Sequence, residues 1–190
     1  MKLRDKKPAL ILIDIQQGLS VNHEKYWGGN RNNQNAEVLC GKLLDKWRTL
    51  SLPLFHVRHS STNPESKLHP SNKGIAFNKH VLPAENEPVI TKHVNSGFIG
   101  TDLQEQLDQL HIKTLVLVGL TTNHCVSATT RMASDLGFET YVIADATATF
   151  DREGVNGETF DAELVHSVTL ASLNEEFATV WDSHKLLAEL

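Results

Sequence analysis

The sequence lacks the features of several protein classes. Only two cysteines, Cys40 and Cys125, occur in 190 residues, so there is no disulfide framework. No apolar run approaches the length that spans a membrane. The net charge is −5 and no basic run occurs, which argues against binding to nucleic acid or to a membrane surface. We therefore expect a protein whose partners are neither nucleic acids nor membranes.

The sequence also lacks nucleotide-binding motifs and a signal peptide. Neither a G-x-G-x-x-G pattern nor a P-loop follows any predicted strand, which argues against nucleotide binding. The apolar stretch near the start is too short for a signal peptide and ends at Asp14. We expect a cytoplasmic protein with reduced thiols. With 40% apolar residues, no internal repeat and enough length for a sizeable core, residues 1–190 are predicted to form one domain.

Short apolar runs alternate with helical patterns along the chain. Strands are predicted at residues 9–13, 54–59, 88–92, 114–119, 140–144 and 177–181. Helices are predicted at residues 35–48, 103–110, 123–136 and 161–173. This alternation predicts an α/β fold, with a six-stranded, mostly parallel sheet that carries helices on both faces.

The segment Leu115–Arg131 combines a buried strand, a turn at Gly119 and a helical pattern in which Cys125 falls in the first turn. Backbone N–H groups and the dipole at a helix start favour an anion, so a thiolate there should have a lowered pKa. The segment thus has the parts of a nucleophile elbow. A small buried cysteine in a core helix is the alternative. Cys40, inside a predicted helix, is interpreted as structural.

Asp14 and Lys92 each end a predicted strand. Because parallel strands point the same way, both residues and Cys125 should share one edge of the sheet, where open α/β sheets bind ligands. Asp14 can then take the thiol proton and return it to a leaving amine, while the charge of Lys92 stabilises the thiolate and the carboxylate. A lysine that extends from a strand end into water is the alternative. His124 should point about 100° away from its neighbour on a helix, which makes it a poor base.

Other polar and aromatic residues have weaker signals. His56 and His59 lie three apart on a strand and point to opposite faces, so no metal site is predicted. His59, at the strand end, is instead a candidate for substrate contact. For Asp145 we favour capping of the following loop over catalysis. Residues 60–83 either cover an active site or form plain surface. Loop residues beside the strand ends are candidate pocket walls: Trp27, Asn95, Phe98 and Phe150.

Three motifs resemble the isochorismatase-like cysteine hydrolases. They are the aspartate in LILIDIQQG, the lysine in ITKHVNSGFIGTDL and the cysteine in VGLTTNHCVSATTRMASDLGFETYVIADAT. The resemblance covers most of the chain and implies a catalytic triad of Asp14, Lys92 and Cys125 in a Rossmann-like three-layer sandwich. It also implies a homo-oligomer, without cofactor, that hydrolyses C–N bonds of small amide-like molecules through a thioester.

The same resemblance implies finer details. The family tends to have a non-proline cis peptide that matches Leu120–Thr121, and the Thr121 and Cys125 amides would then bind the oxyanion. Nicotinamidases carry a zinc-binding Asp-x-His pattern that HVRHSSTNPE lacks, so zinc is not expected. Isochorismatases, which cleave a vinyl ether, typically lack the cysteine, so Cys125 favours C–N hydrolysis. Vinyl-ether hydrolysis with Asp14 as acid, and a binding protein without catalysis, are the alternatives.

Overall fold

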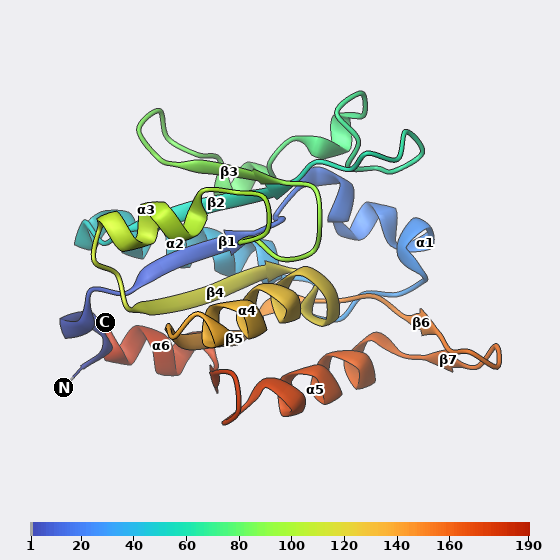
Figure 1. Ribbon diagram of the computed structural model, residues 1–190. Coiled ribbons are helices and arrows are strands. Elements are labelled where there is room, and N and C mark those ends of the chain that lie inside the picture. Colours follow the sequence, from blue (N-terminus) through green and yellow to red (C-terminus); the bar gives the residue numbers. More distant parts are fainter. Residues whose placement is uncertain (1) are drawn as a thin grey trace.

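The computed structural model describes residues 2–190 and contains a six-stranded parallel sheet. The strands follow the order β3-β2-β1-β4-β5-β8, and consecutive neighbours pair in parallel (Figure 1). Their bounds are β1 Ala9–Ile13, β2 Leu54–His59, β3 Val89–Lys92, β4 Thr114–Leu120, β5 Glu139–Ala148 and β8 Thr179–Trp181. The predicted fold class is confirmed.

Helices cover both faces of this sheet. The longer ones are α2 Ala36–Leu50, α3 Leu103–Gln109, α4 Ser127–Asp135, α5 Ala162–Leu173 and α6 Ser183–Glu189. One core cluster joins the sheet to α3, α4 and α5, and a second joins its other face to α2 and α6 (Figure 1). Within residues 2–190, no helix is both long enough and apolar enough to cross a membrane.

Strand β1 shows why the buried strands are continuously apolar. Ala9, Ile11 and Ile13 belong to one core cluster, whereas Leu10 and Leu12 belong to the other. Successive side chains of a strand point to opposite faces, so a strand covered on both faces needs apolar residues at every position. The five-residue run ALILI is accordingly buried throughout.

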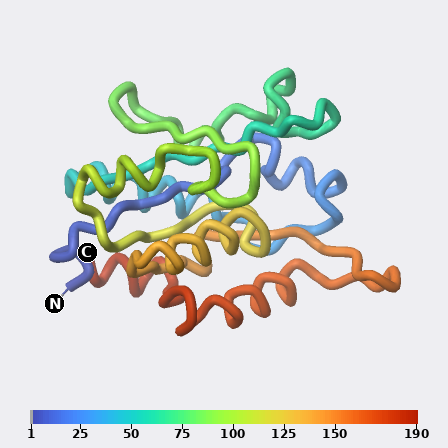
Figure 2. The backbone as a smooth tube through the Cα atoms, viewed as in Figure 1, coloured from blue at the N-terminus to red at the C-terminus, as the bar shows by residue number. Residues whose placement is uncertain are grey.

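The order of the strands also determines where a ligand can bind. From β1 the chain builds outward through β2 and β3, then returns to place β4, β5 and β8 on the other side. The carboxyl ends of β1 and β4 therefore flank the point where the order reverses, which is the usual ligand site of such sheets. Helix α1 (Glu24–Trp27) and the hairpin of β6 (Arg152–Glu153) and β7 (Thr159–Phe160) lie at this end, away from both termini (Figure 2).

Strand β5 is longer than predicted and includes Asp145. The Asp145 carboxylate accepts hydrogen bonds from the backbone N–H and hydroxyl of Ser183 at the start of α6, at 2.8 and 2.6 Å. The predicted capping role therefore fits, although the capped segment is distant in sequence rather than the loop that follows. Asp145 does not line the pocket described below.

Gly119 permits a close approach of β4 to β1. It pairs with Ile13, has φ of +121°, and a Cβ added there would lie 2.0 Å from the Ile13 carbonyl oxygen. The next residue along β1 is Asp14, so this approach sets how closely the carboxylate lies to β4. Only glycine fits this position.

Gly119→Ala is expected to lower the free energy of unfolding by about 3 kcal/mol or more, because the methyl group meets backbone that cannot yield. Gly137→Ala is the matched control, since Gly137 has φ of +86° but open space around the added Cβ. It should cost only about 1–2 kcal/mol, from the backbone conformation alone. Urea unfolding followed by circular dichroism measures both. Equal losses would contradict the importance of the close approach.

Candidate active site

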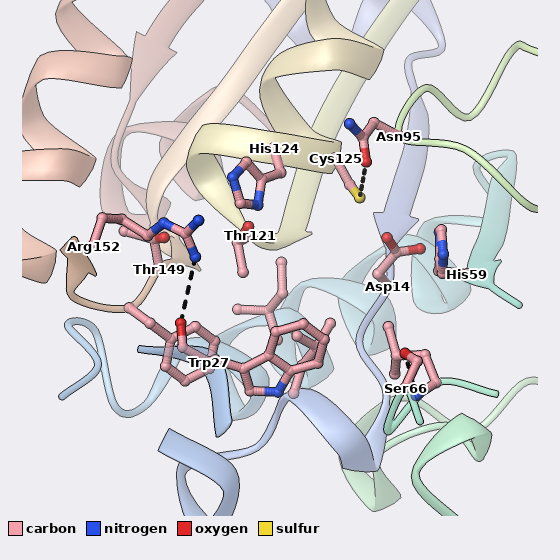
Figure 3. Close-up of a pocket in the computed structure, with 14 residues that line it drawn as sticks. Asp14, Trp27, His59, Ser66, Asn95, Thr121, His124, Cys125, Thr149 and Arg152 are labelled. Atoms are coloured by element: carbon pink, nitrogen blue, oxygen red, sulfur yellow. Dashed lines mark hydrogen bonds between the residues drawn. The ribbon is translucent and has the colours of Figure 1, made fainter. Parts of the chain in front are cut away.

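The structure brings Asp14, Lys92 and Cys125 together at the carboxyl edge of the sheet. The Lys92 ammonium lies 2.6 Å from the Asp14 carboxylate and 3.3 Å from the Cys125 sulfur. Figure 3 shows the Asp14 and Cys125 side chains extending toward each other. Asp14 directly follows β1, Lys92 ends β3, and Cys125 lies in the turn after β4, as the strand-end argument predicted.

Asp14 is held in a conformation that few residues adopt. Its φ is +51°, its backbone N–H donates to the Val57 carbonyl at 2.8 Å, and its own carbonyl accepts from Gln16 N–H at 2.8 Å. The side chain is 1% exposed. Oδ2 pairs with Lys92, whereas Oδ1 is buried and has no hydrogen-bond partner within residues 2–190. A buried oxygen in this state can accept a proton.

Lys92 is fully buried and acts as the positive centre of the site. Besides Asp14 and Cys125, its ammonium contacts the Val94 carbonyl oxygen at 3.2 Å and His59 Nδ1 at 3.3 Å. Burial by itself would lower the pKa of Lys92, but attraction to Asp14 and Cys125 outweighs it and leaves the pKa raised. Lys92 is therefore an ammonium ion at neutral pH.

Cys125 lies in η6 (Thr122–Val126), a π-helical turn that precedes α4. Burial raises the pKa of its thiol and the Asp14 carboxylate raises it further, while Lys92 opposes both only in part. The predicted lowered pKa is therefore wrong, because a helix start alone reveals neither the burial nor the carboxylate. At rest the site holds a carboxylate, an ammonium and a neutral thiol, whose charges sum to zero.

His59 is neutral and presents an N–H group. Since an ammonium can only donate, His59 Nδ1 must accept from Lys92, and the ring proton lies on Nε2. Burial lowers the pKa of His59, and the Lys92 charge lowers it further. The imidazole therefore offers one hydrogen-bond donor at the site.

Asp14, His59 and Cys125 could in principle hold a metal ion, because their ligand atoms lie within 4.8 Å of one another. However, the Lys92 ammonium lies within 3.3 Å of all three. A divalent cation would have to share this space with a buried positive charge, which is strongly unfavourable. The residues present do not fit a metal ion. That the protein binds no metal stays a prediction.

A pocket of about 170 Å³ opens beside Cys125. Of the residues predicted from the sequence, it is lined by Asp14, Trp27, His59, Asn95, Thr121, Cys125 and Phe150 (Figure 3). Asn95 Oδ1 lies 3.9 Å from the Cys125 sulfur. Lys92 lies behind this wall. The Leu120–Thr121 peptide bond is cis, and both of its residues line the pocket.

Phe98 does not line the pocket and is a correction to the predicted walls. Its ring is 8% exposed and lies in the core cluster under α3 and α4, stacked on Phe138 with ring centroids 5.9 Å apart. The sequence placed Phe98 correctly in a turn after β3, but a turn does not reveal to which side its side chain points.

Several lining residues were not predicted. Ser66 and Leu68 come from residues 60–83, so this segment borders the site of its own chain. Leu19, His124, Thr149 and Arg152 also line the pocket. His124 was considered only as a base for Cys125. Thr149 precedes the predicted wall residue Phe150 and Arg152 follows it by two residues, and this closeness in sequence was the available signal.

Comparisons with known proteins agree on one family. The family model described as the isochorismatase domain matches residues 8–183. The isochorismatase family protein YrdC of Bacillus subtilis strain 168 is 44% identical over 183 residues, which cover 96% of each chain. Nicotinamidase 3 of Arabidopsis thaliana is 29% identical, over 97% of this chain and 89% of its own.

A solved structure shows the same similarity. The crystal structure of a protein described as a hydrolase of the isochorismatase family, from Chromobacterium violaceum, superposes with a TM-score of 0.92 at 40% identity. The match covers 100% of this chain and 96% of the other.

Proposed function

This chain belongs to the isochorismatase family of hydrolases, and on that basis we propose that it cleaves a C–N bond of a small amide through a thioester on Cys125. One observation carries the proposal. The Lys92 ammonium contacts both Asp14 and Cys125, while Asp14 retains a buried oxygen that has no partner among the described residues 2–190. That is the arrangement in which a proton can pass from the thiol to the carboxylate.

The first step is formation of the nucleophile. Asp14 takes the proton of the Cys125 thiol, which leaves a thiolate, a neutral carboxylic acid and the Lys92 ammonium. The charges still sum to zero, so the transfer adds no net charge to a buried site. Lys92 stabilises the thiolate through the 3.3 Å contact. A raised thiol pKa means that the neutral thiol is the resting form, and this transfer is the step that produces the thiolate.

The thiolate then attacks the amide carbonyl carbon. The carbonyl oxygen becomes an oxyanion, which the backbone N–H groups of Thr121 and Cys125 stabilise at the pocket wall. When the C–N bond breaks, Asp14 protonates the leaving amine or ammonia. Water next attacks the thioester, Asp14 removes its proton, and the carboxylic acid leaves as the thiol is restored.

A panel of small primary amides tests the proposal. Ammonia release is measured with a coupled assay, and the peptide that contains Cys125 is analysed by mass spectrometry after rapid acid quenching. We expect ammonia release together with an acyl group on Cys125, which hydroxylamine converts to a hydroxamate. Turnover of amides without any acyl group on Cys125 would contradict the thioester route.

The relatives support a hydrolase of this family, but they do not specify the bond that this chain cleaves. One relative is named a nicotinamidase, and its name refers to an amide. Vinyl-ether hydrolysis with Asp14 as acid is the competing activity, and it would leave Cys125 dispensable. Activity in the ether assay that survives loss of the thiol would favour it. We propose that the substrate is a small molecule. The formation of a homo-oligomer stays a prediction.

A further inference from the structure

The positive and negative charges of the pocket do not sum to zero. Among residues 2–190, Asp14 and Arg152 are the only charged residues that line it at neutral pH, since His59 and His124 are neutral. The Asp14 charge is offset by Lys92 at 2.6 Å. The Arg152 charge therefore remains uncompensated, and the pocket as a whole carries one excess positive charge.

Within the part of the chain that the structure describes, Arg152 has no carboxylate partner. None of the ion pairs formed among residues 2–190 includes it, and its side chain is exposed toward the pocket mouth. Two acidic residues, Asp151 and Glu153, flank Arg152 in the sequence. Asp151 uses its carboxylate on the backbone N–H groups of Asn30 and Ala162. Glu153 follows Arg152 on β6, where successive side chains point to opposite faces. The guanidinium, with five N–H donors, thus keeps most of its hydrogen-bonding capacity for a ligand.

The position of Arg152 is also fixed. It begins β6, which pairs with β7, and its Nη1 donates to the Trp27 carbonyl oxygen at 3.4 Å. Its charge reaches the adjacent pocket wall, because partial burial and then Arg152 lower the pKa of His124. His124 is therefore neutral and adds a donor or acceptor beside the guanidinium rather than a second charge.

The catalytic groups and Arg152 lie at opposite ends of the pocket. In Figure 3, Asp14 and Cys125 lie on one side, Arg152 on the other, and Trp27 between them. Trp27 and Phe150 stack with centroids 6.3 Å apart and planes 26° apart, which gives the middle of the pocket a flat apolar wall. The pocket volume of about 170 Å³ is close to the roughly 150 Å³ that holds a benzene ring.

Resting on the proposed function, we propose that the substrate is a small amide with a carboxylate at the end remote from the scissile bond, and that Arg152 binds this carboxylate. The carbonyl lies at Cys125, a short apolar or aromatic spacer lies against Trp27, and the anion meets the guanidinium. Arg152 is then the residue that determines specificity for charged over neutral amides.

Paired probes test this assignment. 4-Carbamoylbenzoate and succinamate carry the carboxylate, while 4-methylbenzamide and butyramide are their neutral counterparts. Binding to Cys125→Ala protein, measured by calorimetry, needs no turnover. We expect each anionic probe to bind at least tenfold more tightly than its neutral counterpart, and added salt to reduce the difference.

Substitution of Arg152 should remove the preference. In the Cys125→Ala background, Arg152→Gln is expected to weaken binding of the anionic probes at least tenfold and to leave the neutral probes within twofold. Arg152→Lys should fall between, because lysine keeps the charge but not the planar pair of donors. Arg4→Gln removes the same charge from an exposed site near the amino terminus and should change nothing.

Three results would overturn the assignment: no binding of either anionic probe, equal binding of charged and neutral probes, or unchanged selectivity in Arg152→Gln. The function is tested separately by ammonia release from wild-type protein. Turnover of neutral amides without any dependence on Arg152 would leave the proposed function standing and remove the inference. Selective binding of anionic probes without any turnover would remove the proposed function and leave Arg152 only a role in binding anions.

Discussion

Cys125→Ala is expected to reduce amide hydrolysis by at least about a thousandfold, because the proposed route has no other nucleophile. Cys125→Ser should lose activity to a similar degree. A serine hydroxyl gives up its proton far less readily than a thiol. His59 cannot take that proton, because its Nδ1 already accepts a hydrogen bond from Lys92. Initial rates of ammonia release at saturating amide, with wild-type protein in parallel, measure the loss.

The second cysteine supplies the control. Cys40 is 1% exposed in the core between α2 and the sheet, where its thiol donates to the Ala146 carbonyl oxygen. Cys40→Ala should keep near-normal turnover and lose only some stability. A Cys125→Ala protein that folds normally and keeps turnover within about tenfold of wild type would remove the thioester mechanism.

The sequence predicts the architecture well because the buried strands carry a strong signal. Runs such as ALILI and LVLVG are apolar at successive positions, which only a strand covered on both faces requires. Once six such runs alternate with helices, the parallel sheet follows, and so does the shared edge of Asp14, Lys92 and Cys125. The order of strands on that edge is an outcome of packing and comes from the structure.

The electrostatic state of the site could not be predicted in the same way. The sequence places Cys125 near a helix start, which suggests an activated thiolate. Its actual surroundings include Asp14, more than a hundred residues earlier in the chain, and partial burial, both of which raise the pKa. A pKa depends on which charges meet across the fold, and sequence spacing within one helix does not contain that information.

Side-chain direction sets a similar limit on the pocket walls. Trp27, Asn95 and Phe150 were chosen as loop residues beside strand ends, and they line the pocket, whereas Phe98 meets the same criterion and points into the core. Arg152 went unpredicted because its loop carries several polar residues. Only the pairing of β6 with β7 and the contact with Trp27 bring this one over the pocket.

Asp14→Asn should have two opposite effects on Cys125. Turnover is expected to fall by about 10²–10⁴, because the carboxylate that accepts the thiol proton is gone. Alkylation of Cys125 by iodoacetamide near pH 7.5 should instead become faster. Removing the negative charge deletes one cause of the raised thiol pKa and leaves the Lys92 ammonium, so a larger fraction of the thiol is ionised at that pH. Mass spectrometry follows the alkylation rate.

Lys92→Met gives the contrasting pattern. It removes the positive charge that opposes the rise in the thiol pKa, so that pKa should rise further and alkylation should slow, although turnover is lost as in Asp14→Asn. Asp145→Asn is the matched control. The Asp145 carboxylate accepts hydrogen bonds from Ser183 away from the pocket, so its loss should affect neither rate.

General damage to the fold would change alkylation in the same direction in both triad variants. Opposite changes, with turnover lost in each, would identify Asp14 as the proton acceptor and Lys92 as the stabilising charge, whereas changes of the same sign would contradict those roles.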